Sequence, residues 1–145
     1  MRTLSIDGYD KALEERLAML KTLLRNFDKF EGIEFVGLEI VNLTKNFYAE
    51  NVAMLFMAKY PEFVKIISER GVTLLELGCC CLYAMEVRPS LVGELIHRKP
   101  SIYNFNSFIH RKLNISDRCD LNKYFSDLFV EIYGLKEAKK IQVDR

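Results

Sequence analysis

Residues 71–115 read GVTLLELGCCCLYAMEVRPSLVGELIHRKPSIYNFNSFIHRKLNI, and this stretch decides the fold of the chain. Its spacing predicts three short helices separated by two breaks. Thr73 and Glu76 have the spacing of a capping box at the start of the first helix. Pro89 suits the first turn of the second helix, where no N–H is needed. Pro100 prevents a continuous helix through the second break.

The third predicted helix covers residues 101–113, with Ser101 as its cap. Its apolar positions recur at steps of three and four, which gives one buried face: Ile102, Phe105, Ile109 and Leu113. Two short helices, a turn and a third helix form the plan of a helix-turn-helix. The other positions supply amide, hydroxyl and cationic groups, the types that reach base edges and phosphates. The predicted DNA-binding residues are Arg98, Lys99, Ser101, Tyr103, Asn104, Asn106, Ser107, His110, Arg111 and Lys112.

Different roles are predicted within this set. The amides of Asn104 and Asn106 can read adenine edges in a major groove. His110 is expected to face phosphate or solvent. Four cations are expected to hold backbone phosphates: Arg98, Lys99, Arg111 and Lys112.

This segment resembles the C-terminal DNA-binding domain of LuxR/NarL-type regulators, especially the diverged versions that end bacterial two-component regulators. In that family a Thr-x-x-Glu opens the first helix, as Thr73 and Glu76 do here. The family's recognition helix carries Val-x-Asn-x-x-x-x-Ile-x-x-Lys-Leu. This chain matches it at Ile102, Asn104, Ile109, Lys112 and Leu113. A Pro-Asp/Glu-Phe motif upstream of the family's domain is matched by residues 61–63, and the resemblance covers residues 71–133.

The predicted fold class is therefore all-α. A helical N-terminal region over residues 1–70 precedes a four-helix LuxR-like helix-turn-helix domain over residues 71–133. Residues 134–145 form a charged tail that we expect to be mobile. The fourth helix begins near Leu121, after a cap region at residues 116–117. It either forms a dimerisation surface, as the resemblance implies, or only packs over the first three helices.

Two upstream segments leave alternatives open. Residues 9–30 read as an amphipathic helix, which either packs on its own domain or pairs with a partner chain as a dimer helix. Residues 33–43 fit both strand and helix spacing. We favour a helix there, because a lone strand leaves its backbone groups unpaired. Residues 47–58 and a segment starting at Pro61 read as two further helices.

Charge is distributed unevenly along the chain, although the formal net charge is only +1. Residues 1–87 carry ten basic and 13 acidic side chains, a net charge of −3. Residues 88–112 carry five basic side chains and one acidic, a net charge of +4. A local basic patch is what phosphate contact requires, although such a cluster can also be a solvated face.

The four cysteines do not form a metal-binding pattern. Cys79, Cys80 and Cys81 are consecutive, and neighbours on a helix point about 100° apart, so all three cannot face one ion. No C-x-x-C pair occurs. We expect this run to pack mainly in the core, and we expect no metal and no cofactor.

The sequence therefore predicts a DNA-binding transcriptional regulator, acting as a homodimer on double-stranded DNA. The alternative is a helical protein–protein interaction module that keeps the helix-turn-helix shape. An exposed Phe108 favours this alternative, because it makes the third helix apolar outside; burial of both Phe105 and Phe108 favours DNA. The N-terminal helices can also bind a protein partner. No catalytic motif is present, so we do not expect an enzyme.

Composition indicates a globular protein without a membrane span. Half of the residues are hydrophobic and 28% are charged, which is typical of a folded domain. No run of 18 apolar residues occurs, and residues 1–10 do not resemble a signal peptide. We therefore expect a cytoplasmic protein.

Overall fold

The computed structural model is helical throughout the part of the chain that it describes. That part consists of residues 11, 14–15, 17–22, 25, 47–96 and 98–143, with the backbone alone at 47, 48 and 99. No strand occurs among these residues, so the predicted all-α class is confirmed. The undecided residues 33–43 lie outside this part.

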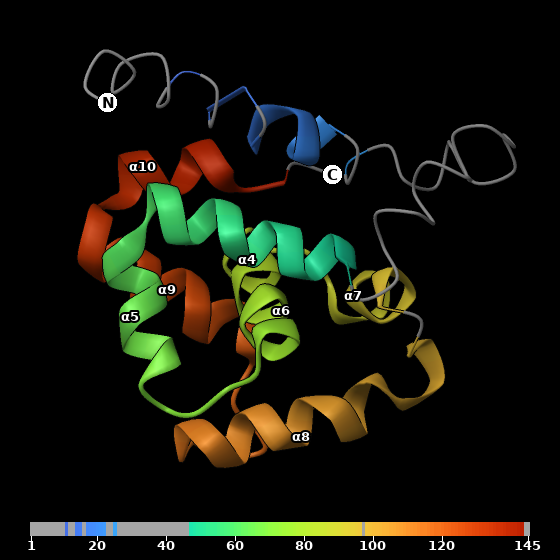
Figure 1. The fold of residues 1–145 in the computed structure, drawn as a ribbon. Coiled ribbons are helices and arrows are strands. Elements are labelled where there is room, and N and C mark those ends of the chain that lie inside the picture. The colour runs from blue at the N-terminus through green and yellow to red at the C-terminus, as the bar shows by residue number, and fades with distance from the viewer. Residues whose placement is uncertain are drawn as a thin grey trace, which may run out of the picture.

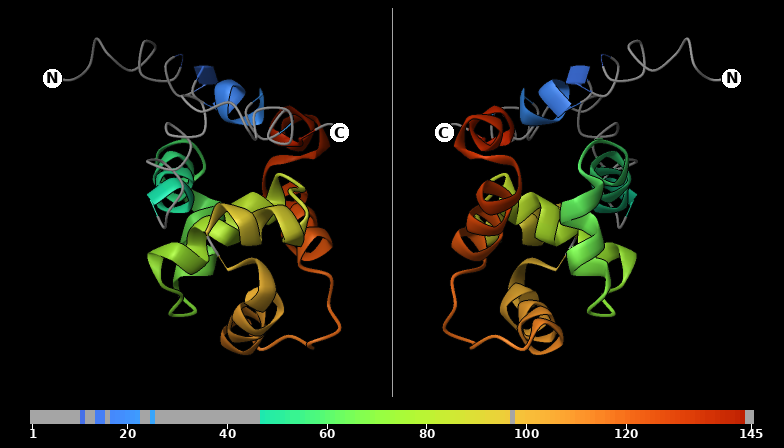
Figure 2. Two further views of the ribbon diagram at one scale, coloured as in Figure 1. Left: turned by 90° about the vertical axis from the view of Figure 1, so that its right-hand side faces the viewer. Right: turned by 90° about the vertical axis from the view of Figure 1, so that its left-hand side faces the viewer.

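Seven α-helices and one 3-10 turn follow one another between residues 47 and 143 (Figures 1 and 2). They are α4 (Phe47–Lys59), α5 (Pro61–Ser68), α6 (Leu74–Ala84), α7 (Pro89–Leu95), η1 (Lys99–Ser101), α8 (Ile102–Leu113), α9 (Leu121–Tyr133) and α10 (Leu135–Ile141). The helices predicted in this part of the chain are confirmed, and α10 is an addition to them.

Helix α6 is the centre of this arrangement. Every residue from Glu76 to Met85 is buried, and α6 contacts α4, α5, α7 and α9. At Gly78 the backbone of α4 comes so close that an added Cβ would overlap the carbonyl of Ala49. The glycine is therefore what allows α4 and α6 to cross at this distance.

The start of α6 has the predicted capping box. The Thr73 hydroxyl accepts a hydrogen bond from the Glu76 N–H at 3.1 Å, and Glu76 Oε1 accepts one from the Thr73 N–H at 2.8 Å. These bonds satisfy two N–H groups that have no partner within the helix. Pro89 stands in the first turn of α7, as predicted.

Two predicted caps are wrong. The Ser101 side chain makes no capping bond, because the turn η1 already leads the chain into α8. Helix α9 is capped by Asp120 and not by residues 116–117: Asp120 Oδ1 accepts hydrogen bonds from the N–H groups of Asn122 and Lys123.

The expectation of a mobile tail is also wrong for residues 134–143. Gly134 ends α9 with φ +94°, and α10 follows it directly. Ala138, Ile141 and Val143 are buried against the other helices. The Val143 N–H donates to the carbonyl oxygen of Met85 at 2.9 Å, which ties the chain end to the end of α6. The apolar positions among the charges supply the burial that holds this segment.

The described residues between 11 and 25 are helical, and Leu17 and Leu20 among them pack on the chain's own core. Leu17 is buried. Lys59 pairs with Glu14 at 3.3 Å, and Lys21 Nζ donates to the Lys140 carbonyl at 2.8 Å. These contacts favour the alternative in which this helix covers its own domain. Three apolar residues within the predicted helix over 9–30 lie outside the described residues: Leu13, Leu24 and Phe27.

One hydrophobic core includes residues from α4 to the end of α10, and Leu17 also packs in it. The consecutive residues Cys79, Cys80 and Cys81 are all fully buried in it, which confirms their core role. Burial raises the pKa of the Cys80 and Cys81 thiols well above the usual range, so these groups stay neutral. No described helix has the length and apolar character needed to cross a membrane.

Replacing Gly78 with alanine tests the close helix crossing. Helix propensity alone predicts that this change raises the free energy of unfolding by about 1 kcal/mol. We expect instead a loss of about 3 kcal/mol in the free energy of unfolding, because the methyl group overlaps the Ala49 backbone. Urea denaturation measures this. Gly71→Ala is the comparison: its Cβ has open space but φ is +80°, so we expect a loss of only about 1 kcal/mol. If Gly78→Ala stabilises the protein, the close crossing of α4 and α6 is contradicted.

Thiol reactivity tests the burial of the cysteine run. We expect a charged disulfide reagent to react quickly in the native state only with Cys119, the one cysteine that is not buried. All four thiols should react in about 8 M urea, in which a domain of this size is unfolded. Raising the pH to about 9, near the ordinary thiol pKa, should not release the other three. Rapid native labelling of Cys80 contradicts its placement.

Candidate nucleic-acid interface

Helix α8 has one face turned to the core and one face turned to solvent. In both views of Figure 2 it lies at one end of the molecule, away from α10. The buried residues recur along one side of the helix: Ile102, Asn106, Ile109, His110 and Leu113. Tyr103, Asn104, Phe108 and Arg111 are exposed. The helix is therefore held by one side and presents the other.

Asn106 belongs to the buried face, and only 5% of it is exposed. Its Oδ1 accepts a hydrogen bond of 2.9 Å from the hydroxyl of Tyr83, which is fully buried on α6. Burial raises the pKa of Tyr83, so this hydroxyl remains a donor. The expectation that Asn106 reads a base edge is wrong for this conformation, because the amide is engaged inside the protein.

His110 is buried as well, at 7% exposure, contrary to the expectation that it faces phosphate or solvent. Its Nδ1 lies 2.9 Å from the carbonyl oxygen of Asn106, one turn earlier on α8. Its Nε2 lies 3.0 Å from the carbonyl oxygen of Cys119. The ring therefore ties α8 to the connection that leads into α9.

Lys112 is half-buried and paired. Its Nζ donates to Glu76 Oε1 at 2.7 Å, and the same oxygen accepts the capping bond from Thr73. Glu76 is buried, so Lys112 supplies the positive charge that its carboxylate needs away from water. Lys112, which was predicted to contact phosphate, thus fixes the end of α8 against the start of α6.

The outward face of α8 carries four other predicted residues: Tyr103, Asn104, Ser107 and Arg111. Tyr103 is 74% exposed, and Asn104 and Arg111 are also exposed. Ser107 is half-buried, and its hydroxyl donates to the Asn104 carbonyl at 2.6 Å. Tyr103, Ser107 and Arg111 follow at steps of four and span about 12 Å at the helical rise. No acidic residue occurs in α8.

Two arginines each lie over an aromatic ring of α8. The guanidinium carbon of Arg111 is 4.7 Å from the centre of the Phe108 ring, and that of Arg98 is 5.4 Å from the centre of the Phe105 ring. Phe105 is half-buried against the core, whereas Phe108 is 50% exposed. Neither pair was predicted from the sequence. The three-residue step from Phe108 to Arg111 is the signal that could have revealed one of them.

Three predicted residues precede α8. Arg98 and Ser101 are exposed before and within η1. The side chain of Lys99 lies outside the described residues. Of the ten predicted residues, the structure thus brings six onto or beside the outward face of α8: Arg98, Ser101, Tyr103, Asn104, Ser107 and Arg111.

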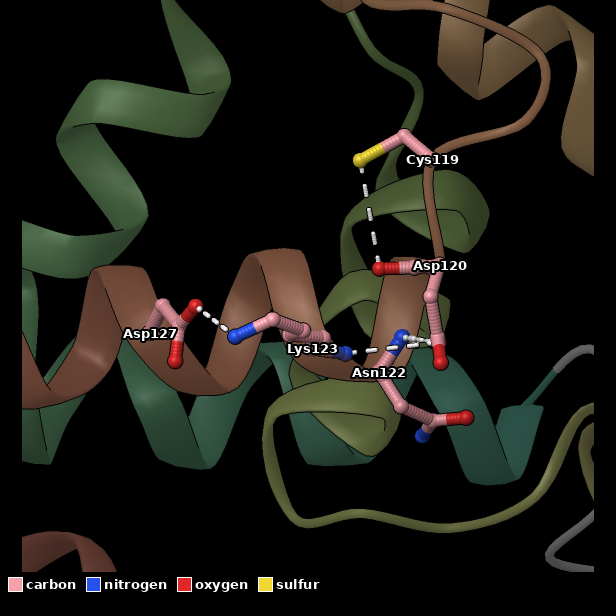
Figure 3. Close-up of polar contacts among 5 residues, drawn as sticks. All are labelled: Cys119, Asp120, Asn122, Lys123 and Asp127. Atoms are coloured by element: carbon pink, nitrogen blue, oxygen red, sulfur yellow. Dashed lines mark hydrogen bonds and ion pairs between the residues drawn. The ribbon is translucent and has the colours of Figure 1, made fainter.

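A cavity of about 410 Å³ lies between α8 and the connection to α9, and its lining includes Ser107, His110 and Cys119. The Cys119 sulfur lies 4.0 Å from the Asp120 carbonyl oxygen, and the Asp120 carboxylate caps α9 (Figure 3). His110 meets the backbone carbonyl of Cys119 and not its thiol. The two residues therefore do not form a nucleophile–base pair in this geometry. The described residues contain no group of three side chains that could hold a metal ion.

Comparison with protein-family models, with curated proteins and with solved structures finds no significant match to this chain.

The two asparagines of α8 provide a matched test of the two faces. Asn106→Ala leaves the Tyr83 hydroxyl buried without its acceptor, so we expect a loss of about 2 kcal/mol in the free energy of unfolding. Asn104→Ala removes an exposed amide, and we expect a change within about 0.5 kcal/mol. Chemical denaturation of both variants measures the difference. Equal losses would contradict the assigned faces.

Proposed function

We propose that the chain is a DNA-binding regulator that places the outward face of α8 in a major groove. The observation that carries the proposal is this face itself. It is exposed, contains hydroxyl, amide and guanidinium groups, and lacks carboxylates. Such groups are the ones that contact base edges and phosphates. The resemblance of residues 71–133 to LuxR/NarL-type domains points to the same function.

The proposal assigns roles to the residues that are accessible. Asn104 is the proposed reader of an adenine edge, with Tyr103 and Ser107 beside it. Arg98 and Arg111 are the proposed phosphate contacts. An α-helix with its side chains is about 10–12 Å in diameter, which fits the width of a major groove of about 12 Å. Asn106, His110 and Lys112 support the helix from within and make no proposed contact with DNA.

A homodimer is part of the proposal. A single module of this kind buries only about 600–1,000 Å² on DNA, which gives weak binding. Two copies on half-sites about 34 Å apart would add their contacts. The expected cytoplasmic location also belongs to the proposal.

A second candidate function follows from Phe108. By the criterion set from the sequence, its 50% exposure favours binding of a protein partner through α8. The ring is not open on both sides, however, because the Arg111 guanidinium lies over it. A cationic group on the ring makes the patch less apolar than the exposure alone suggests, and for this reason we place DNA first.

A salt series of binding to a labelled 20-base-pair duplex of random sequence tests the proposal. We expect the logarithm of the affinity to fall linearly with the logarithm of the salt concentration. Arg98→Ala/Arg111→Ala should lower the magnitude of that slope by about two, because each lost phosphate contact contributes about 0.9. The affinity at low salt should fall about tenfold or more.

The matched control is Lys136→Ala/Lys139→Ala on α10. It removes the same charge from exposed positions at the end of the molecule opposite α8. We expect this variant to keep the wild-type slope. An equal reduction in both variants would show attraction to the whole surface and not to α8. Absence of wild-type binding at low salt would overturn the proposal and leave the protein-partner candidate.

A further inference from the structure

Each of the two aromatic rings of α8, Phe105 and Phe108, has an arginine over it. Both separations, 5.4 Å for Arg98 on Phe105 and 4.7 Å for Arg111 on Phe108, lie within the range of a cation–π contact. The two arginines come from different places in the chain, one before η1 and one in the last turn of α8. The two rings are neighbours, one helical turn apart.

The rings differ in how firmly they are held. Phe105 packs against the hydrophobic core, so its position is fixed by the same burial that fixes α8. Phe108 is on the solvent side, and Arg111 covers part of it. Both arginines are exposed, and among the described residues no ion pair with a carboxylate is found for either. The ring beneath it is thus the contact that holds each guanidinium.

This orientation matters for binding an anion. A free arginine side chain loses about 2 kcal/mol of rotamer freedom when it is fixed. A guanidinium that is already held over a ring loses less on binding. The ring accepts none of its N–H groups as an oxygen would, so they remain available for a bidentate contact with a phosphate.

We infer that Phe105 and Phe108 are positioning residues that hold Arg98 and Arg111 as two prepared phosphate contacts beside the outward face of α8. The inference rests on the proposed function, because the phosphates are those of a DNA backbone. It assigns the exposed Phe108 a role within DNA binding. A protein anchor would need the ring itself as the contact, whereas this role needs the ring only as support for the guanidinium.

The first test concerns the free protein. The Arg111 side-chain protons should show an upfield ring-current shift in the NMR spectrum of the wild type. We expect that shift to be lost in Phe108→Leu and retained in Phe108→Tyr. Phe108 is exposed, so these variants should fold as the wild type does. An Arg111 shift that is the same in Phe108→Leu and wild type overturns the inference, whatever the DNA result.

The second test is a double-mutant cycle on the random-sequence duplex at low salt. We expect Phe108→Leu to weaken binding about threefold to fivefold, the size of an exposed cation–π contact, and Phe108→Tyr to bind as wild type. In the Arg111→Ala background, Phe108→Leu should have no further effect, because the guanidinium that it orients is absent.

The outcomes separate this inference from the function on which it rests. If wild type binds DNA and Phe108→Leu binds equally well, the positioning role is overturned and the proposed function stands. An undiminished effect of Phe108→Leu in the Arg111→Ala background also overturns it, since the ring then acts by itself. If wild type binds no DNA, both fail.

Discussion

The structure depends on the complete burial of α6. From Glu76 to Met85 this helix has no side open to water, so each of its polar groups needs a partner inside the protein. The Tyr83 hydroxyl donates a hydrogen bond to Asn106 on α8, and the backbone carbonyl oxygen of Tyr83 accepts one from the Asn122 side-chain amide on α9. Glu76 receives Lys112 of α8. The demands of one buried helix thus fix the position of two others.

These buried polar contacts also decide which side of α8 faces outward. Three polar side chains of α8 bond to α6 or to the connection before α9: Asn106, His110 and Lys112. A rotation of α8 would leave the buried Tyr83 hydroxyl without its acceptor and the buried Glu76 carboxylate without its cation, at a cost of about 1–3 kcal/mol for each lost hydrogen bond. The outward stripe that begins at Tyr103 is therefore a consequence of the interior, and its polarity is what the proposed function uses.

The sequence alone predicted where the helices lie, but it did not predict which face of α8 is buried and which is exposed. Apolar spacing, the Thr73 box and the prolines predicted the helices because these signals act within a few residues of the chain. Asn106 and His110 were predicted as surface residues because polar side chains usually are. Their burial depends on Tyr83 and on the Cys119 carbonyl, partners that no local pattern identifies. The packed segment after Gly134 was missed for the same reason.

Backbone amide NMR of the full chain during titration with a random-sequence 20-base-pair duplex shows directly which surface meets DNA. We expect shift changes concentrated at Tyr103, Asn104, Ser107 and Arg111, with small changes along α10. We also expect α8 to remain helical and Asn106 to keep its buried environment. Changes centred on α10 or α4, with α8 unaffected, would contradict the claim that the outward face of α8 is the binding surface.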